Sequence, residues 1–140
     1  MELVEIKRDL FTMPDEYCLA HCISADAKMG AGIAVLFRKK FKLSSLQEKA
    51  LRNELEVGKC YKVDRIINLI TKSKYWHKPT YETLTAAVSS MKEICICESI
   101  SKLAMPEIGC GLDKLQWGRV KEILKEEFKQ LPIEIIVCRL

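Results

Sequence analysis

The 140-residue chain is long enough for one folded domain and too short for two independent hydrophobic cores. Its composition is 49% hydrophobic, 30% charged and 7% aromatic, close to the globular average, which excludes a disordered, collagen-like or disulfide-stapled chain. The net charge of +4 hides a segregation, because residues 28–78 carry 13 basic and only 4 acidic side chains. Such an excess fits an anionic partner such as a phosphate group, or a solvated lysine-rich surface.

Strand and helix patterns alternate along the chain, with no repeat or linker between them. In chain order we expect strands at residues 3–6, 18–23, 60–63, 66–70, 103–105 and 133–137. Helices are predicted after residue 32, over residues 45–52, from Pro79, whose fixed φ suits a first helical turn, with Thr80 helping to cap, and over residues 117–131. In the first of these helices, Ile33, Leu36 and Phe37 are expected to face inward.

Alternating units of this kind predict a three-layer α/β domain with a largely parallel sheet. Ligand chemistry is then expected at the carboxyl ends of the strands.

The seven cysteines are odd in number and contain no C-x-x-C pair, which is typical of reduced thiols in the cytosol. Neither of the two histidines is spaced with cysteine as a zinc-ligand set, so no metal is expected. The chain begins with a strand-like segment, and its apolar runs are shorter than a membrane span. We therefore expect a soluble cytoplasmic protein, or a nuclear one if the source is eukaryotic.

Most candidate functional residues fall in three segments that lead out of predicted strands, at residues 21–33, 71–79 and 105–117. Gly30-Ala31-Gly32 opens a helix, and Gly109-Cys110-Gly111 follows another strand. Backbone N–H groups at such turns can hold a phosphate, although glycines here also suit a tight turn between closely packed elements.

Three charged residues near strand ends are candidates for chemistry. Lys72 is either a desolvated, nucleophilic amine or a plain surface cation. Asp113 is positioned to face whatever the second glycine loop holds, or to serve a turn or cap near the helix start. Asp9 could accept a hydrogen bond from the amino group of a base, or simply end the first strand in a turn. Cys22 and Cys110 lie in two of the loops, where packing is the favoured role.

Taken in order, several segments resemble the macrodomain family and, more narrowly, its terminal ADP-ribose protein glycohydrolase branch. The resemblance extends over essentially the whole chain, so residues 1–140 are interpreted as a single macrodomain. It is carried by residues 19–24, 29–37, 69–72, 77–82 and 106–117. It implies a mixed, mostly parallel six-stranded sheet between helices, with ADP-ribose bound over the strand ends.

The resemblance also implies a role for individual residues. Asp9 would accept from the adenine amino group and Leu10 would contact the base through its backbone, while Ser24 would lie near the distal ribose. The remaining residues implied to bind ADP-ribose include both diphosphate loops; they are Cys22, Met29, Gly30, Ala31, Gly32, Ile33, Thr71, Pro106, Ile108, Gly109, Cys110, Gly111 and Leu112. Ala25, Tyr75 and Trp76 have no counterpart in the family pattern and are candidates to reshape the substrate side of the cleft.

Lys72 and Asp113 match the catalytic pair of this branch. There the lysine attacks the anomeric carbon of the distal ribose and the aspartate transfers protons, so the resemblance implies removal of mono-ADP-ribose from Glu or Asp side chains. Deacylation of O-acyl-ADP-ribose is implied as a further activity. We expect desolvation, and cations such as Lys74 or Lys78 if they lie close, to lower the pKa of Lys72. No cofactor is expected.

Three other functions remain open at this point. They are an ADP-ribose-1''-phosphate phosphatase, an enzyme that removes ADP-ribose from nucleic acid, and a module that only binds ADP-ribose. The expected partners are ADP-ribose and ADP-ribosylated protein, with ADP-ribosylated nucleic acid as the alternative, and no membrane. The expected oligomeric state is a monomer.

Overall fold

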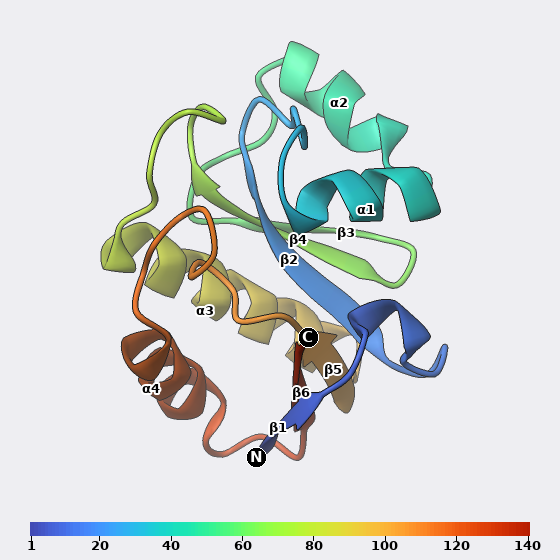
Figure 1. Ribbon diagram of the computed structural model, residues 1–140, viewed down its shortest axis with the longest axis vertical. Helices are drawn as coiled ribbons and strands as arrows, with labels where there is room; N and C mark the ends of the chain where they lie inside the picture. Colours follow the sequence, from blue (N-terminus) through green and yellow to red (C-terminus); the bar gives the residue numbers. More distant parts are fainter.

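A six-stranded sheet runs through the centre of the computed structural model, which describes residues 1–140 (Figure 1). The strand order is β1-β6-β5-β2-β4-β3, and all neighbours are parallel except β3 and β4, which form an antiparallel hairpin. The mixed, mostly parallel sheet is therefore confirmed. The strands are β1 (Glu2–Lys7), β2 (Cys18–Ser24), β3 (Cys60–Val63), β4 (Ile66–Lys72), β5 (Lys102–Met105) and β6 (Glu134–Arg139).

Helices cover both faces of this sheet. One face carries α1 (Ile33–Lys40) and α2 (Ser44–Leu51), and the other carries α3 (Tyr81–Cys97) and α4 (Trp117–Phe128) (Figure 1). A single 3₁₀ turn, η1 (Leu10–Thr12), follows β1. This arrangement confirms the three-layer architecture. None of these helices combines the length and the apolar character that crossing a membrane requires.

The central strands alternate between two apolar cores. In β4, Ile67 and Leu69 pack with α3 and α4, whereas Ile66 and Ile70 pack with α1 and α2. Because successive side chains of a strand point to opposite faces, a strand covered on both sides buries apolar side chains on each of them. This is the physical reason why residues 66–70 are apolar instead of alternating, except for Asn68, which is buried with hydrogen-bond partners.

Four local expectations differ from the structure. Leu36 is 45% exposed instead of buried, because it lines the open cleft described below. Pro79 precedes the helix, since Thr80 is the N-cap of α3 and forms a capping box with Thr83. The last helix ends at Phe128, before Leu131. Finally, β4 continues through Lys72, which therefore lies in the strand and not beyond it.

The carboxyl ends of the parallel strands open at one edge of the sheet. The connections that leave β2, β4 and β5 at that edge lead into α1, α3 and α4. Segments far apart in the sequence, at residues 24–32, 73–80 and 106–116, are thereby brought to the same end of the molecule (Figure 1).

Candidate active site

A large open cleft lies over the carboxyl edge of the sheet. Its volume is about 1640 Å³, which is ample for a dinucleotide-sized ligand. Apart from Thr71, every residue singled out in the sequence as a catalytic or ligand-binding candidate lines this cleft. These residues are Asp9, Leu10, Cys22, Ser24, Met29, Gly30, Ala31, Gly32, Ile33, Lys72, Pro106, Ile108, Gly109, Cys110, Gly111, Leu112 and Asp113.

Thr71 does not line the cleft. Its side chain is buried beneath the surface, and its hydroxyl oxygen has no hydrogen-bond partner. The ladder with β2 is irregular at this point, because Ile70 pairs with Ile23 and Lys72 with Ser24, which leaves Thr71 as an extra residue without a partner in β2.

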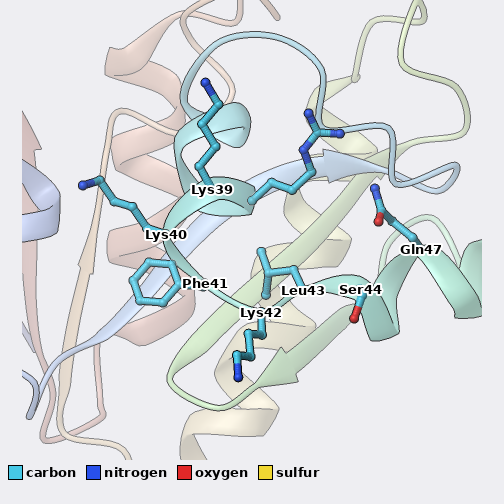
Figure 2. A pocket seen from close by; sticks show the side chains of 8 residues that line it. Lys39, Lys40, Phe41, Lys42, Leu43, Ser44 and Gln47 are labelled. Atoms are coloured by element: carbon cyan, nitrogen blue, oxygen red, sulfur yellow. The ribbon is translucent and has the colours of Figure 1, made fainter.

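A second, smaller hollow of about 510 Å³ lies at the junction of α1 and α2. Its cations are Arg38, Lys39, Lys40 and Lys42. Lys39, Lys40 and Lys42 point in three different directions, so no group of side chains converges on a bound ligand there (Figure 2). The larger cleft, which Lys40 also lines, is therefore the candidate site, and Arg38 and Lys39 are exposed cations at the end of α1.

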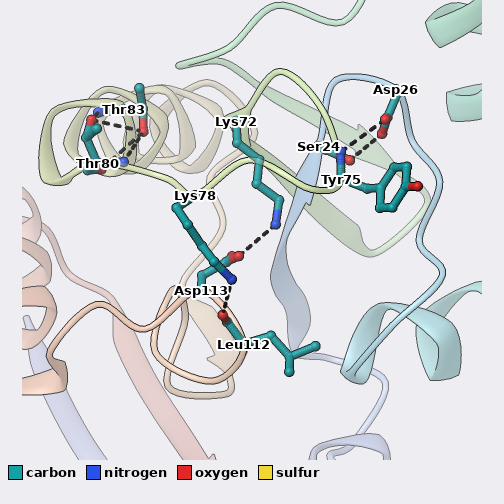
Figure 3. Close-up of polar contacts among 9 residues, drawn as sticks. All are labelled: Ser24, Asp26, Lys72, Tyr75, Lys78, Thr80, Thr83, Leu112 and Asp113. Carbon is teal, nitrogen blue, oxygen red and sulfur yellow. Dashed lines mark hydrogen bonds and ion pairs between the residues drawn. The ribbon is translucent and has the colours of Figure 1, made fainter.

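The centre of the cleft holds an ion pair between Lys72 and Asp113. Lys72 ends β4 and Asp113 lies in the β5–α4 connection, and Lys72 Nζ donates to Asp113 Oδ1 at 2.7 Å (Figure 3). The two side chains are only 14% and 16% exposed, so the pair is shielded from solvent more than a surface salt bridge is. The charged group in contact with the Lys72 ammonium is thus a carboxylate, not a neighbouring cation.

The connection that carries Asp113 is tied to the opposite side of the cleft. Lys78, on the β4–α3 connection, donates from Nζ to the backbone oxygen of Leu112 at 2.7 Å (Figure 3). Lys78 therefore holds the loop next to Asp113 and does not contact the Lys72 ammonium.

Within each glycine loop, the two glycines have different structural roles. Gly32 and Gly109 have φ of +61° and +74°, a backbone conformation that favours glycine. At Gly30 and Gly111 an added Cβ would meet nothing within 4 Å, so these positions border open space in the cleft. Gly32 is also the N-cap of α1 and provides no side-chain acceptor, which leaves first-turn N–H groups of α1 available to an anion.

The end of the cleft near β1 is built by η1. Asp9 caps this turn, because its Oδ1 accepts from the backbone N–H of Phe11 at 2.9 Å. Arg8 is directed to Thr12, where its guanidinium donates to Oγ1 at 2.9 Å and to the backbone oxygen at 2.8 Å. Leu10 is buried and forms part of the floor.

Two cysteines lie on the cleft, but neither is an activated nucleophile. Burial raises the pKa of the Cys22 thiol, with a further contribution from the Asp113 charge. Burial also raises the pKa of Cys110 to about 11. Both are protonated thiols near neutral pH, consistent with the packing role expected for them. No group of three or more His, Cys, Asp or Glu side chains converges to hold a metal ion.

Two polar residues that do not line the cleft, one in β2 and one in the loop after it, have structural roles that were not recognised in the sequence. Asp26 accepts hydrogen bonds from groups on two loops, and His21 is fully buried under the cleft with its Nε2 against Asn68 Oδ1 at 2.6 Å. The sequence offered two signals for these roles. His21 is a polar residue inside an apolar strand, and Asp26 is a carboxylate two residues after the end of that strand.

Comparisons with known proteins identify the family. No protein-family model matches the chain. However, the chain is 45% identical over 139 residues to the human protein named ADP-ribose glycohydrolase OARD1, covering 96% of this chain and 90% of the human one. The chain belongs to the macrodomain family. A mycobacterial protein named DNA ADP-ribosyl glycohydrolase (Mycobacterium tuberculosis) is 30% identical over 129 residues, which are 84% of this chain and 36% of that protein.

Solved structures agree on the fold of this macrodomain. The macrodomain of Mycobacterium tuberculosis DarG superposes with a TM-score of 0.91 at 23% identity, covering 99% of this chain and 97% of that one. Thermosipho africanus DarTG in complex with ADP-ribose gives a TM-score of 0.83 at 22% identity, covering 99% and 42%.

Proposed function

We propose that this macrodomain is an ADP-ribose glycohydrolase that removes mono-ADP-ribose from Glu and Asp side chains through Lys72 and Asp113. The observation that carries the proposal is the shielded 2.7 Å pair of an amine and a carboxylate in the cleft between the two glycine loops. A module that only binds ADP-ribose needs the glycine loops but has no use for a nucleophile beside a base. The human relative, named an ADP-ribose glycohydrolase, supports the same assignment.

The proposed reaction begins with a proton transfer. Attack needs the neutral amine, and Asp113 Oδ1 is the group placed to take the proton from Lys72 Nζ. The amine then forms a bond to C1'' of the distal ribose, while the bond from C1'' to the carboxylate oxygen breaks and the carboxylate leaves as an anion. Water later displaces Lys72 from C1'', with Asp113 available to move the proton. A carboxylate is a good leaving group, so the pair suffices for an ester-linked substrate.

The remaining parts of the cleft support binding of the rest of ADP-ribose. Gly30 and Gly111 leave room for the diphosphate, Ser24 lies on the cleft for the distal ribose, and Asp9 keeps one carboxylate oxygen, Oδ2, free of the turn it caps. The same step extends to O-acyl-ADP-ribose that carries its acyl group on the C1'' oxygen, because the bond from C1'' to the acyl carboxylate would break and the carboxylate would leave.

The test is turnover of a transferase that carries Glu-linked mono-ADP-ribose. We expect the wild-type protein to release the label, and Lys72→Ala and Asp113→Ala to lose at least about 100-fold in rate while still binding free ADP-ribose. Lys74→Ala is the matched control, because Lys74 lies two residues after Lys72, beyond the end of β4, and does not line the cleft. Normal turnover by Lys72→Ala would overturn the proposal.

A second candidate substrate is ADP-ribosylated nucleic acid. Tyr75 and Trp76 are 61% and 67% exposed, Tyr75 lines the cleft, and Lys74 and Lys78 flank the two rings in sequence. Exposed aromatic rings interleaved with cations suit stacking on bases along a phosphate backbone. The name of the mycobacterial relative, DNA ADP-ribosyl glycohydrolase, favours the same substrate class. Turnover of modified DNA that falls steeply with added salt, beside salt-independent turnover of O-acyl-ADP-ribose, would favour this substrate.

A further inference from the structure

We propose that Asp26 is a positioning residue for the reaction: its carboxylate ties the loop after β2 to the loop after β4 and so holds Lys72 and Ser24 in their working geometry. The inference rests on the proposed function, since it concerns the reaction in which Lys72 takes part. Asp26 itself does not line the cleft, so it acts through other groups and does not touch the substrate.

Three donors converge on the Asp26 carboxylate. Oδ1 accepts from Ser24 Oγ and from the backbone N–H of Lys28, the latter at 3.3 Å. Oδ2 accepts from the backbone N–H of Tyr75 at 3.0 Å, across the gap between the two loops (Figure 3). Ser24, Lys28 and Tyr75 all line the cleft. One carboxylate behind the cleft wall thus holds three groups that form the wall.

The hydrogen bonds of Asp26 lie next to the point where the regular pairing of β2 with β4 is interrupted. In the β2–β4 ladder Ile23 pairs with Ile70, but Ser24 pairs with Lys72, so the register shifts by one residue and Thr71 is the extra residue of a bulge. A bulge re-aims the next side chain but weakens the ladder that would otherwise fix it. Beyond the bulge, the backbone N–H of Ala25 donates to Lys72 O at 2.8 Å, and the Asp26 bond to Tyr75 N follows three residues later.

These two hydrogen bonds connect the β2–α1 loop to the backbone of residues 72–75. The first is made by a main-chain group that any residue at position 25 supplies. The second depends on the Asp26 side chain. Removing the carboxylate therefore frees the segment after Lys72 without changing the residues that contact the substrate.

The protonation state of Asp26 suits a carboxylate that only accepts hydrogen bonds. Partial burial acts to raise its pKa, but the hydrogen bonds from Ser24, Tyr75 and Lys28 outweigh it and hold the pKa below the usual range. The carboxylate is ionised near neutral pH and can accept all three bonds at once.

The test compares Asp26→Asn with wild type in single-turnover release of Glu-linked ADP-ribose, in binding of free ADP-ribose, and in hydrogen exchange of the Tyr75 amide. Asn keeps the shape but replaces one acceptor by a donor, so it cannot accept from both loops. We expect the rate to fall about 10- to 100-fold, because small misplacements of a reacting group cost this much. ADP-ribose affinity should change by less than about threefold, and exchange at Tyr75 should accelerate.

Two further variants sharpen the result. Asp26→Ser can still accept from the N–H of Lys28 in a local turn but is too short to reach Tyr75, so its rate should fall as in Asp26→Asn. It also keeps the proposal testable if the Asn variant fails to fold. Asp64→Asn makes the same chemical change in the exposed turn between β3 and β4 and should match wild type.

Two outcomes would overturn the inference. One is wild-type turnover by Asp26→Asn together with faster exchange at Tyr75, which would mean that the tie is broken without consequence. The other is a loss of ADP-ribose affinity as large as the loss of rate, which would make Asp26 a binding or folding residue. Absence of turnover by the wild-type protein would instead be a failure of the proposed function.

Discussion

His21 shows how a single polar residue is accommodated inside this sheet. Its side chain has no solvent exposure, its ring stacks on Phe37 with centroids 3.8 Å apart, and Nε2 lies 2.6 Å from Asn68 Oδ1. Nδ1 has no partner, so the ring is a neutral imidazole with its proton on Nε2. Burial lowers the pKa of His21 to about 4, against the hydrogen bond to Asn68, which raises it.

This buried imidazole predicts a pH-dependent loss of stability. Below pH 6.5 the unfolded chain takes up a proton at His21, while the native protein does so only near pH 4, so the free energy of unfolding falls as pH falls through that window. The loss amounts to about 3 kcal/mol. Denaturant unfolding of wild type and His21→Gln between pH 7 and 4 measures it.

The Gln variant should be less stable at pH 7 but nearly flat across the same window, because it removes the titrating group. His77→Gln, a change in the loop after β4, is the control and should keep the wild-type slope. A slope that survives in His21→Gln would contradict the assignment.

At the scale of elements, the two glycine loops are connections whose glycines have separate tasks. Gly109 needs its positive φ, and an added Cβ would lie 3.1 Å from Leu115 Cδ1. Gly111 has ordinary φ and open space around it. The first glycine therefore serves the fold of the loop, while the second leaves the cleft free.

Alanine at these two positions should separate stability from binding. Gly109→Ala is expected to destabilise the protein by about 1–2 kcal/mol, because a Cβ is disfavoured at positive φ and is crowded by Leu115. Gly111→Ala should leave the melting temperature within about 2 °C of wild type but weaken ADP-ribose binding on the order of 10-fold, because its methyl group takes up space in the cleft. Thermal unfolding and calorimetric titration measure the two effects. Unchanged affinity in Gly111→Ala would place the diphosphate elsewhere.

At the scale of the whole molecule, the cleft draws on loops from both halves of the chain. The β2–α1 loop packs with the core that includes α1 and α2, and the β5–α4 loop with the core that includes α3 and α4. A ligand that bridges these loops binds only the folded protein, so its binding free energy adds to the stability of the whole sheet.

ADP-ribose at 100 times its Kd should therefore raise the free energy of unfolding by about 2.7 kcal/mol and the melting temperature on the order of 10 °C. Thermal unfolding with and without ligand is the measurement. The hypoxanthine analogue of ADP-ribose, which lacks the amino group assigned to Asp9, should give a smaller shift at the same concentration. Equal shifts for the two ligands would remove Asp9 from base recognition.

Much of this structure was predictable because it depends on local patterns. Apolar runs and helical spacing located every strand and helix to within a few residues, and the order of the loop motifs indicated a macrodomain with Lys72 and Asp113 on one cleft. The positions of the strands and helices follow from the period of side-chain direction, which the sequence carries directly. The macrodomain fold and the roles of Lys72 and Asp113 were instead implied by the resemblance of the loop motifs to that family.

What only the tertiary structure decided concerns residues whose partners are distant in the chain. Asp26 resembles an ordinary loop carboxylate until the β4–α3 loop lies beside it, and the burial of Thr71 beside the cleft residue Lys72 occurs where the β2–β4 register shifts. The contact between Lys72 and Asp113 spans 41 positions of sequence. Spacing along the chain determines which side of an element a residue occupies, but hydrogen bonds and ion pairs depend on distances in space, and those are set when the sheet brings its loops together.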